Sequence, residues 1–134
     1  MNWLRIVEAS VSASLLVSLT DWYFFGVLFH DKYLTYPEVW RRNSSGGGES
    51  RAIIWGTLLS AFTCVAFVLF CVAIRRTRLP ETLGIAAMIW LMTAVPLIVT
   101  NALFMKIDRA IVVSHSLGWL AKLLIAAVAV GCLL

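Results

Sequence analysis

Most of the side chains in this sequence that could do chemistry lie inside long hydrophobic segments. Asp21 lies in the first segment, Asn101 in the third, and His115 and Lys122 in the fourth. A charged side chain at the centre of a membrane costs about 2.5–3.5 kcal/mol on insertion scales, so such residues normally face the interior of a helix bundle and find partners there. A carboxylate near an imidazole can bind a ligand or pass protons.

The depth of these groups follows from a helical rise of about 1.5 Å per residue. Face A is the side of the membrane on which the chain begins, and face B is the opposite side. Asp21, Asn101 and His115 each lie roughly 8–10 Å from the middle of their segments, all toward face B. Tyr23 follows Asp21 closely, and Lys122 lies near the middle of its segment. The sequence therefore predicts a polar pocket for a small ligand or a proton, lined by these residues, with Lys122 at its floor.

Two structural interpretations compete with this pocket. In the first, the polar residues form a buried hydrogen-bonded cluster that fixes the order of the helices, with Lys122 paired to Asp21. In the second, Lys122 extends toward the interface and Asp21 reaches it directly, as long amphipathic side chains do. The sequence leaves all three interpretations open.

Catalysis and metal binding find little support. Two histidines, His30 and His115, do not make a recognisable ligand set without further partners. The three cysteines, Cys64, Cys71 and Cys132, lie inside hydrophobic segments without a Cys-x-x-Cys pair, so we expect small apolar residues rather than ligands or disulfides. No catalytic residue, metal ion or cofactor is predicted, and the protein is expected to be non-enzymatic.

Four long hydrophobic segments must position the polar groups. Of the 134 residues, 61% are hydrophobic and 13% are charged, whereas a soluble domain has about a quarter of its residues charged. The segments cover residues 3–29, 52–74, 83–105 and 110–134, and each is close to or above the roughly 20 residues needed to cross a bilayer. Only helices satisfy their backbone groups in lipid at this length. The sequence thus predicts an all-α membrane protein, a single transmembrane domain formed by a four-helix bundle.

The connections refine this bundle. Residues 31–42 carry Tyr33, Tyr36 and Trp40 at helical spacing, which predicts an amphipathic segment anchored at the membrane interface. Residues 43–50 read as a flexible linker. Pro80 and Glu81 suit the first turn of the third helix. An even number of spans puts both termini on one side, and we expect an integral protein of the bacterial inner (plasma) membrane.

Small residues at intervals of four predict close helix packing, either within the bundle or in a homo-oligomer or larger membrane complex. They are Ser10, Ser14 and Ser18 in the first helix, Gly56, Ser60 and Cys64 in the second, and Ala110, Ser114 and Gly118 in the fourth. The net charge of +4 lies in short basic runs beside the hydrophobic segments. Such runs anchor helix ends at the lipid bilayer, so nucleic acid is not an expected partner.

Several short motifs are shared with a known family. They are Met1-Asn2-Trp3-Leu4, Trp22-Tyr23, Gly26-Val27-Leu28-Phe29, Asn101-Ala102-Leu103-Phe104 and Gly118-Trp119-Leu120. On these residues the chain resembles the small four-helix membrane proteins known as the domain of unknown function 1761. That family usually has a proline after the Trp-Tyr pair, where this chain has Phe24-Phe25, and Asp21 and His115 also differ from its common pattern.

The resemblance implies the four-helix architecture and no particular activity. The residues themselves favour a module that binds or moves a small ligand or a proton in the polar pocket. The alternative is a small accessory or assembly subunit of a larger membrane complex.

Overall fold

Four membrane-spanning helices make up the computed structural model, which describes residues 2–34 and 48–134. In chain order the elements are α1 (Trp3–Asp21), the π-helix η1 (Trp22–Leu28), the 3-10 helix η2 (His30–Leu34), α2 (Gly48–Ala73), α3 (Leu79–Ile89), the π-helix η4 (Trp90–Ala94), α4 (Val95–Phe104) and α5 (Arg109–Leu133). Four stretches are long and apolar enough to cross a membrane: Trp3–Leu28, Ser50–Ala73, Leu79–Phe104 and Arg109–Leu133. The predicted all-α, four-transmembrane-helix architecture is confirmed.

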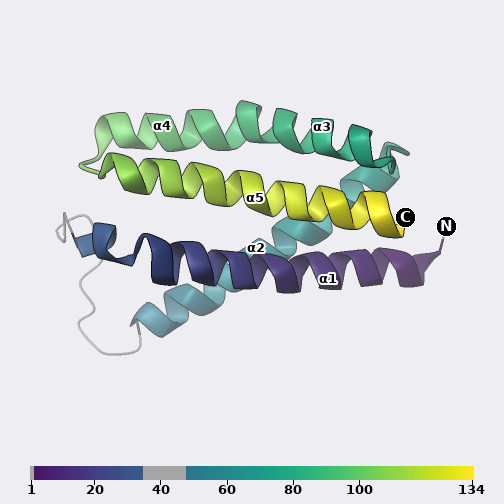
Figure 1. Ribbon diagram of the computed structural model, residues 1–134, viewed down its shortest axis with the longest axis horizontal. Helices are drawn as coiled ribbons and strands as arrows, with labels where there is room; N and C mark the ends of the chain where they lie inside the picture. The colour runs from purple at the N-terminus through teal and green to yellow at the C-terminus, as the bar shows by residue number, and fades with distance from the viewer. Residues whose placement is uncertain (1, 35–47) are drawn as a thin grey trace.

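The last helix, α5, lies at the centre of the bundle (Figure 1). It runs between α1 on one side and α3 and α4 on the other, and it contacts all of the other α-helices. α2 crosses α1 and α5 obliquely (Figure 1). The chain starts and ends at the same end of the bundle, where α2 also connects to α3.

The core is built mainly from small side chains. On α1, the buried residues Ile6, Ala9, Ala13 and Val17 recur every three or four positions and so form one helix face. They join a cluster to which α5 contributes Leu123, Ala126, Ala127, Ala129 and Val130. Because lipid tails are as apolar as the helices, close packing of such small residues replaces the hydrophobic effect as a source of stability.

The ends of the helices follow from local sequence. α3 starts at Leu79, with Pro80 and Glu81 in its first turn as predicted, which is four residues before the predicted hydrophobic segment. Asp108 caps α5 by accepting a hydrogen bond from the backbone N–H of Ala110 at 2.7 Å. Because only four residues separate Phe104 from Arg109, α4 and α5 are antiparallel neighbours.

Two π-helical turns interrupt the spans. η4 ends at Ala94, two residues before Pro96. Proline has no N–H to donate to the preceding turn, and the N–H of Val95 bonds to the carbonyl of Trp90. η1 follows Asp21 and ends at Phe29. Each π-helical turn rotates the residues that follow it around the helix axis. Side chains after the turn therefore point in a different direction from the one that an uninterrupted α-helix would give them.

The first connection is described only in part. Tyr33 lies in η2, whereas Tyr36, Trp40 and the rest of the predicted interfacial segment lie outside the described residues. α2 begins at Gly48, inside the predicted linker of residues 43–50.

Candidate functional site

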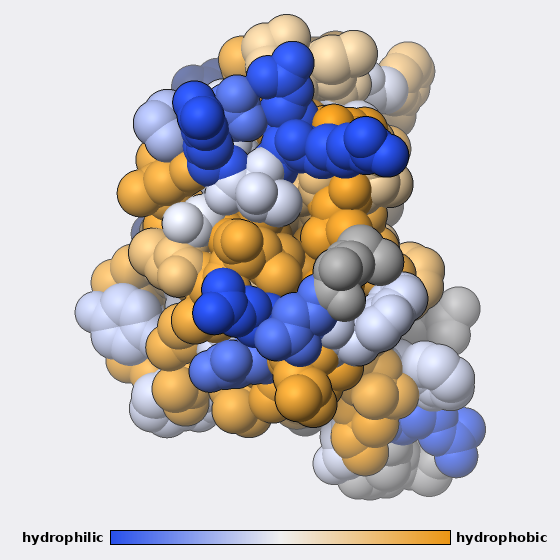
Figure 2. Space-filling view, turned by 90° about the vertical axis from the view of Figure 1, so that its right-hand side faces the viewer, coloured by the Kyte–Doolittle hydropathy of each residue, from blue (hydrophilic) through white to orange (hydrophobic). Residues whose placement is uncertain are grey.

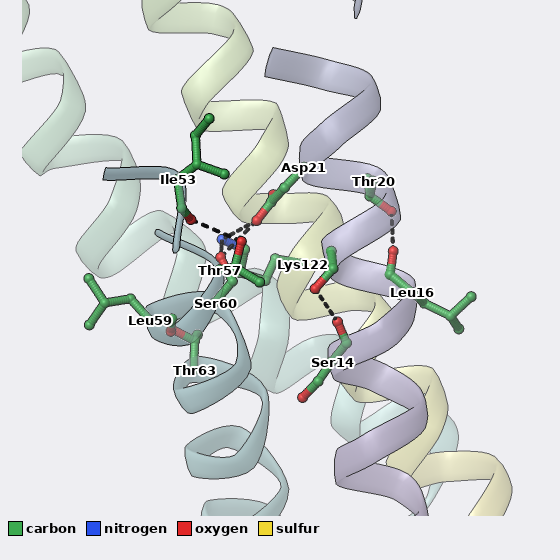
Figure 3. Close-up of polar contacts among 11 residues, drawn as sticks. Ser14, Leu16, Thr20, Asp21, Ile53, Thr57, Leu59, Ser60, Thr63 and Lys122 are labelled. Carbon is green, nitrogen blue, oxygen red and sulfur yellow. Dashed lines mark hydrogen bonds and ion pairs between the residues drawn. The ribbon is translucent and has the colours of Figure 1, made fainter. Parts of the chain in front are cut away.

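Asp21, Ser60 and Lys122 come together inside the bundle (Figure 3). The Lys122 ammonium lies 3.2 Å from Asp21 Oδ2 and donates a hydrogen bond to Ser60 Oγ at 2.7 Å. The Ser60 hydroxyl in turn donates to Asp21 Oδ2 at 2.7 Å. These three side chains, which we call the triad, form a closed ring of polar contacts that joins α1, α2 and α5.

The triad is largely removed from the bundle surface. The side chain of Lys122 is 10% exposed and that of Asp21 is 20% exposed, so the carboxylate is the more accessible of the two charges. Lys122 Nζ also lies 4.9 Å from the ring centroid of Trp119, one turn earlier on α5. The aromatic ring offers a further favourable contact to the ammonium.

The hydroxyl of Ser60 is used differently from those of the serines on α1. Ser14 and Ser18 donate to backbone carbonyls of their own helix, Ser10 O at 2.7 Å and Ser14 O at 2.9 Å. Ser60 instead donates across to Asp21. Its small size lets α2 approach α1 and α5, and its hydroxyl then links the two charges.

His115 lies on the same helix as Lys122, toward its start, and contacts a neighbouring helix. Its ring centroid is 4.9 Å from that of Phe25 in η1. Gly118 allows this close approach, because a Cβ at position 118 would lie only 3.1 Å from the Phe25 ring. Phe25, in the π-helical turn that follows Asp21, therefore packs against α5.

Other predicted members of the pocket lie apart from the triad. Tyr23 is 49% exposed, and Asn101 is exposed near the end of α4. The depths estimated from the helical rise are compatible with the contact between Asp21 and Lys122. Depth does not say which side of its helix a residue occupies, and Tyr23 and Asn101 point away from the bundle interior.

Two hollows lie away from the triad. One, of about 290 Å³, lies between α1 and α2 along Ser10, Ser14 and Ser18. The other, of about 420 Å³, lies at one end of the bundle and has Arg5 and Arg75 among its lining residues. Neither is lined by a triad residue. Within residues 2–34 and 48–134, no three His, Cys, Asp or Glu side chains are placed to hold a metal ion.

Two residues were missed by sequence reasoning about the site. Ser60 was considered only as a small packing residue, although a hydroxyl within the uncharged hydrophobic segment of residues 52–74 was a usable signal. Ser114, two turns before Lys122 on α5, is fully buried, and its hydroxyl has no hydrogen-bond partner among the described residues. A buried hydroxyl without a hydrogen-bond partner is uncommon in folded proteins.

Comparison with known proteins identifies a family and nothing more specific. A family model described as "Protein of unknown function (DUF1761)" matches residues 9–131. The match confirms the resemblance that the short motifs indicated. No curated protein and no solved structure matches the chain.

Proposed function

Because that match covers nearly the whole chain, the protein belongs to the DUF1761 family, and we propose that it is a non-enzymatic membrane module that binds and passes on protons at the triad. The observation that carries the proposal is the ring of hydrogen bonds between two charged groups buried in the membrane. Ionisable residues inside spans are costly, and proton relays are one of their established uses.

The triad geometry supports a concerted proton shift. Lys122 can give a proton to Ser60 Oγ while Ser60 gives its own proton to Asp21 Oδ2, because the two hydrogen bonds are both 2.7 Å long. The shift converts an ammonium and a carboxylate into a neutral amine and a neutral acid, and the Ser60 hydroxyl is restored.

The contacts favour a proton over a larger ligand. The three polar groups touch one another directly, and neither of the two hollows described above is lined by them. A small polar ligand would have to separate Asp21 from Lys122 before binding. The buried hydroxyl of Ser114 on the Lys122 helix supports a polar route toward face B.

Proton movement can be measured in liposomes that contain a pH-sensitive dye. The purified protein is reconstituted, an inward proton gradient is applied with a potassium clamp, and the acidification rate is compared with that of empty liposomes. We expect the wild-type protein to accelerate acidification and the Asp21→Asn/Lys122→Met variant to match empty liposomes.

The matched control is Asp31→Asn/Lys32→Met, which removes the same two charges at exposed positions in η2. It should retain the wild-type rate. Equal rates for wild-type protein and the triad variant, with both folded by circular dichroism, would show that the triad passes no protons.

Both termini lie on the same side of the membrane in this proposal, since the number of spans is even. Labelling of cysteines introduced at Asn2 and Leu134 with a membrane-impermeant maleimide tests the orientation. Both positions should react from the same side of the membrane. Reaction from opposite sides would contradict the proposed topology.

A further inference from the structure

The second hollow lies at the end of the bundle where the chain begins and ends, far from the triad. It has a volume of about 420 Å³ and lies where α1, the α2–α3 turn and the end of α5 meet. Its polar walls come from Asn2, Arg5, Arg75 and Thr77. Figure 2 looks onto this end of the molecule and shows two groups of hydrophilic side chains with hydrophobic side chains between them.

The apolar part of the hollow is formed by Ile6, Val72 and Leu134. Ile6 is buried and belongs to the core cluster, so the floor of the hollow is continuous with the interior of the bundle. An occupant must therefore combine a group that binds arginine with an apolar portion. The helix ends here lie at the boundary between hydrocarbon and head groups.

The two arginines carry charges that the described part of the chain does not neutralise. Arg76 pairs with Glu81 at 2.8 Å, so that carboxylate is already engaged. Within residues 2–34 and 48–134, neither Arg5 nor Arg75 forms an ion pair or a side-chain hydrogen bond, and Glu8 forms no ion pair with them. Both guanidinium groups are exposed at the hollow and are available to an anion.

The backbone holds Arg75 in a conformation that arginine rarely adopts. Its φ is 57°, and among the described non-glycine residues it alone has a positive φ. The N–H of Arg76 bonds to the carbonyl of Cys71 at 2.9 Å and the N–H of Arg75 to that of Val72 at 3.1 Å, which is the Schellman pattern at the end of α2. Glycine usually occupies this position, because a side chain there is strained. An arginine at this site is consistent with a binding role for its side chain.

We propose that this hollow binds the head group of an anionic phospholipid, a phosphate diester whose charge is not offset by a choline cation, with the upper part of an acyl chain against Ile6 and Val72. Guanidinium groups bind phosphate oxygens through paired, charge-assisted hydrogen bonds. The Thr77 hydroxyl and the Asn2 amide can donate to the remaining oxygens. Free phosphate shares the anionic chemistry and lacks the apolar portion, so the two sources are separable.

Native mass spectrometry of the delipidated protein tests the site. The protein is titrated with phosphatidylglycerol, with phosphatidylcholine of the same acyl chains, and with inorganic phosphate. Each arginine near a membrane surface contributes about fivefold to the binding of an anionic lipid, so two should give a preference of about thirtyfold. We expect one phosphatidylglycerol to bind with that preference, and inorganic phosphate at equal concentration not to displace it.

The variant Arg5→Gln/Arg75→Gln should lose the preference, whereas Arg76→Gln/Arg78→Gln should keep it although the same charge is removed from the same end. Equal loss in both variants would reduce the effect to general surface charge and overturn the site. If wild-type protein bound the two lipids equally well, this result alone would overturn the proposed site. Displacement by inorganic phosphate would overturn the lipid as occupant.

Discussion

Removal of one charge from the triad should be more damaging than removal of both. Lys122→Met leaves the Asp21 carboxylate inside the bundle with Ser60 as its remaining triad partner. Loss of one partner from a buried ion pair costs about 3–5 kcal/mol. Because the Asp21 side chain is 20% exposed, we expect the lower end, about 3 kcal/mol, for this variant and likewise for Asp21→Leu.

The double variant Asp21→Leu/Lys122→Met buries no charge. Apolar replacement of both partners of a buried pair is often neutral or stabilising, and the Ser60 hydroxyl can turn to its own helix, so we expect a loss of about 1 kcal/mol or less. The double-mutant cycle then gives a coupling energy of at least about 5 kcal/mol, well above the average of about 0.6 kcal/mol for hydrogen bonds between membrane helices.

Unfolding in mixed micelles of increasing SDS content, followed by circular dichroism, gives the four free energies of this cycle. Asp31→Leu/Lys32→Met serves as the control, because both side chains are exposed and their replacement should change stability by less than about 0.5 kcal/mol. Additive losses of the two single variants in the double variant would refute the reasoning, since independent residues do not couple.

Three further predictions concern packing and the backbone. Thr82→Val should lower the free energy of unfolding by about 1 kcal/mol in the same assay, because the buried Thr82 hydroxyl donates to a carbonyl of α5 at 2.9 Å; no change would contradict a role for this bond. Gly131→Ala should lower the free energy of unfolding by about 1–3 kcal/mol, because the added Cβ would lie 2.7 Å from Leu79 Cα. Gly56→Ala, where nothing lies within 4 Å, should instead be neutral or stabilising, and equal effects at both glycines would contradict the packing. Arg75→Gly should raise the free energy of unfolding by about 1 kcal/mol by relieving the positive φ, and a loss of stability would show that the arginine side chain holds the fold together.

The architecture was predictable because it depends on the length and hydropathy of segments. Each span is long enough to cross a membrane, and the charged turn after Phe104 is too short to allow anything except an antiparallel pair. The start of α3 was indicated by Pro80 and Glu81, and α2 extends further toward its start than hydropathy alone indicates. Hydropathy measures burial in lipid and is insensitive to a polar first turn such as Gly48–Ser50.

For the site residues, the sequence could predict only their depth along the membrane normal. The rise per residue brought Asp21 and Lys122 to compatible depths, and their pairing was one of the alternatives that the sequence left open. The rotation of each helix depends on contacts between distant segments and on the π-helical turns, of which η4 had a local signal in Pro96 and η1 had none. That rotation turns Ser60 inward and leaves Asn101 exposed.

The central claim is that Asp21 exchanges a proton while it remains within the triad. Infrared difference spectroscopy of the reconstituted protein after a jump from alkaline to acidic buffer measures this directly, through the C=O stretch of a protonated carboxyl group. The account predicts that one component of the carboxylic acid band of wild-type protein is lost in Asp21→Asn and retained in Asp31→Asn. Identical difference spectra for wild-type protein and Asp21→Asn would contradict it, because Asp21 would then stay ionised as a purely structural partner of Lys122.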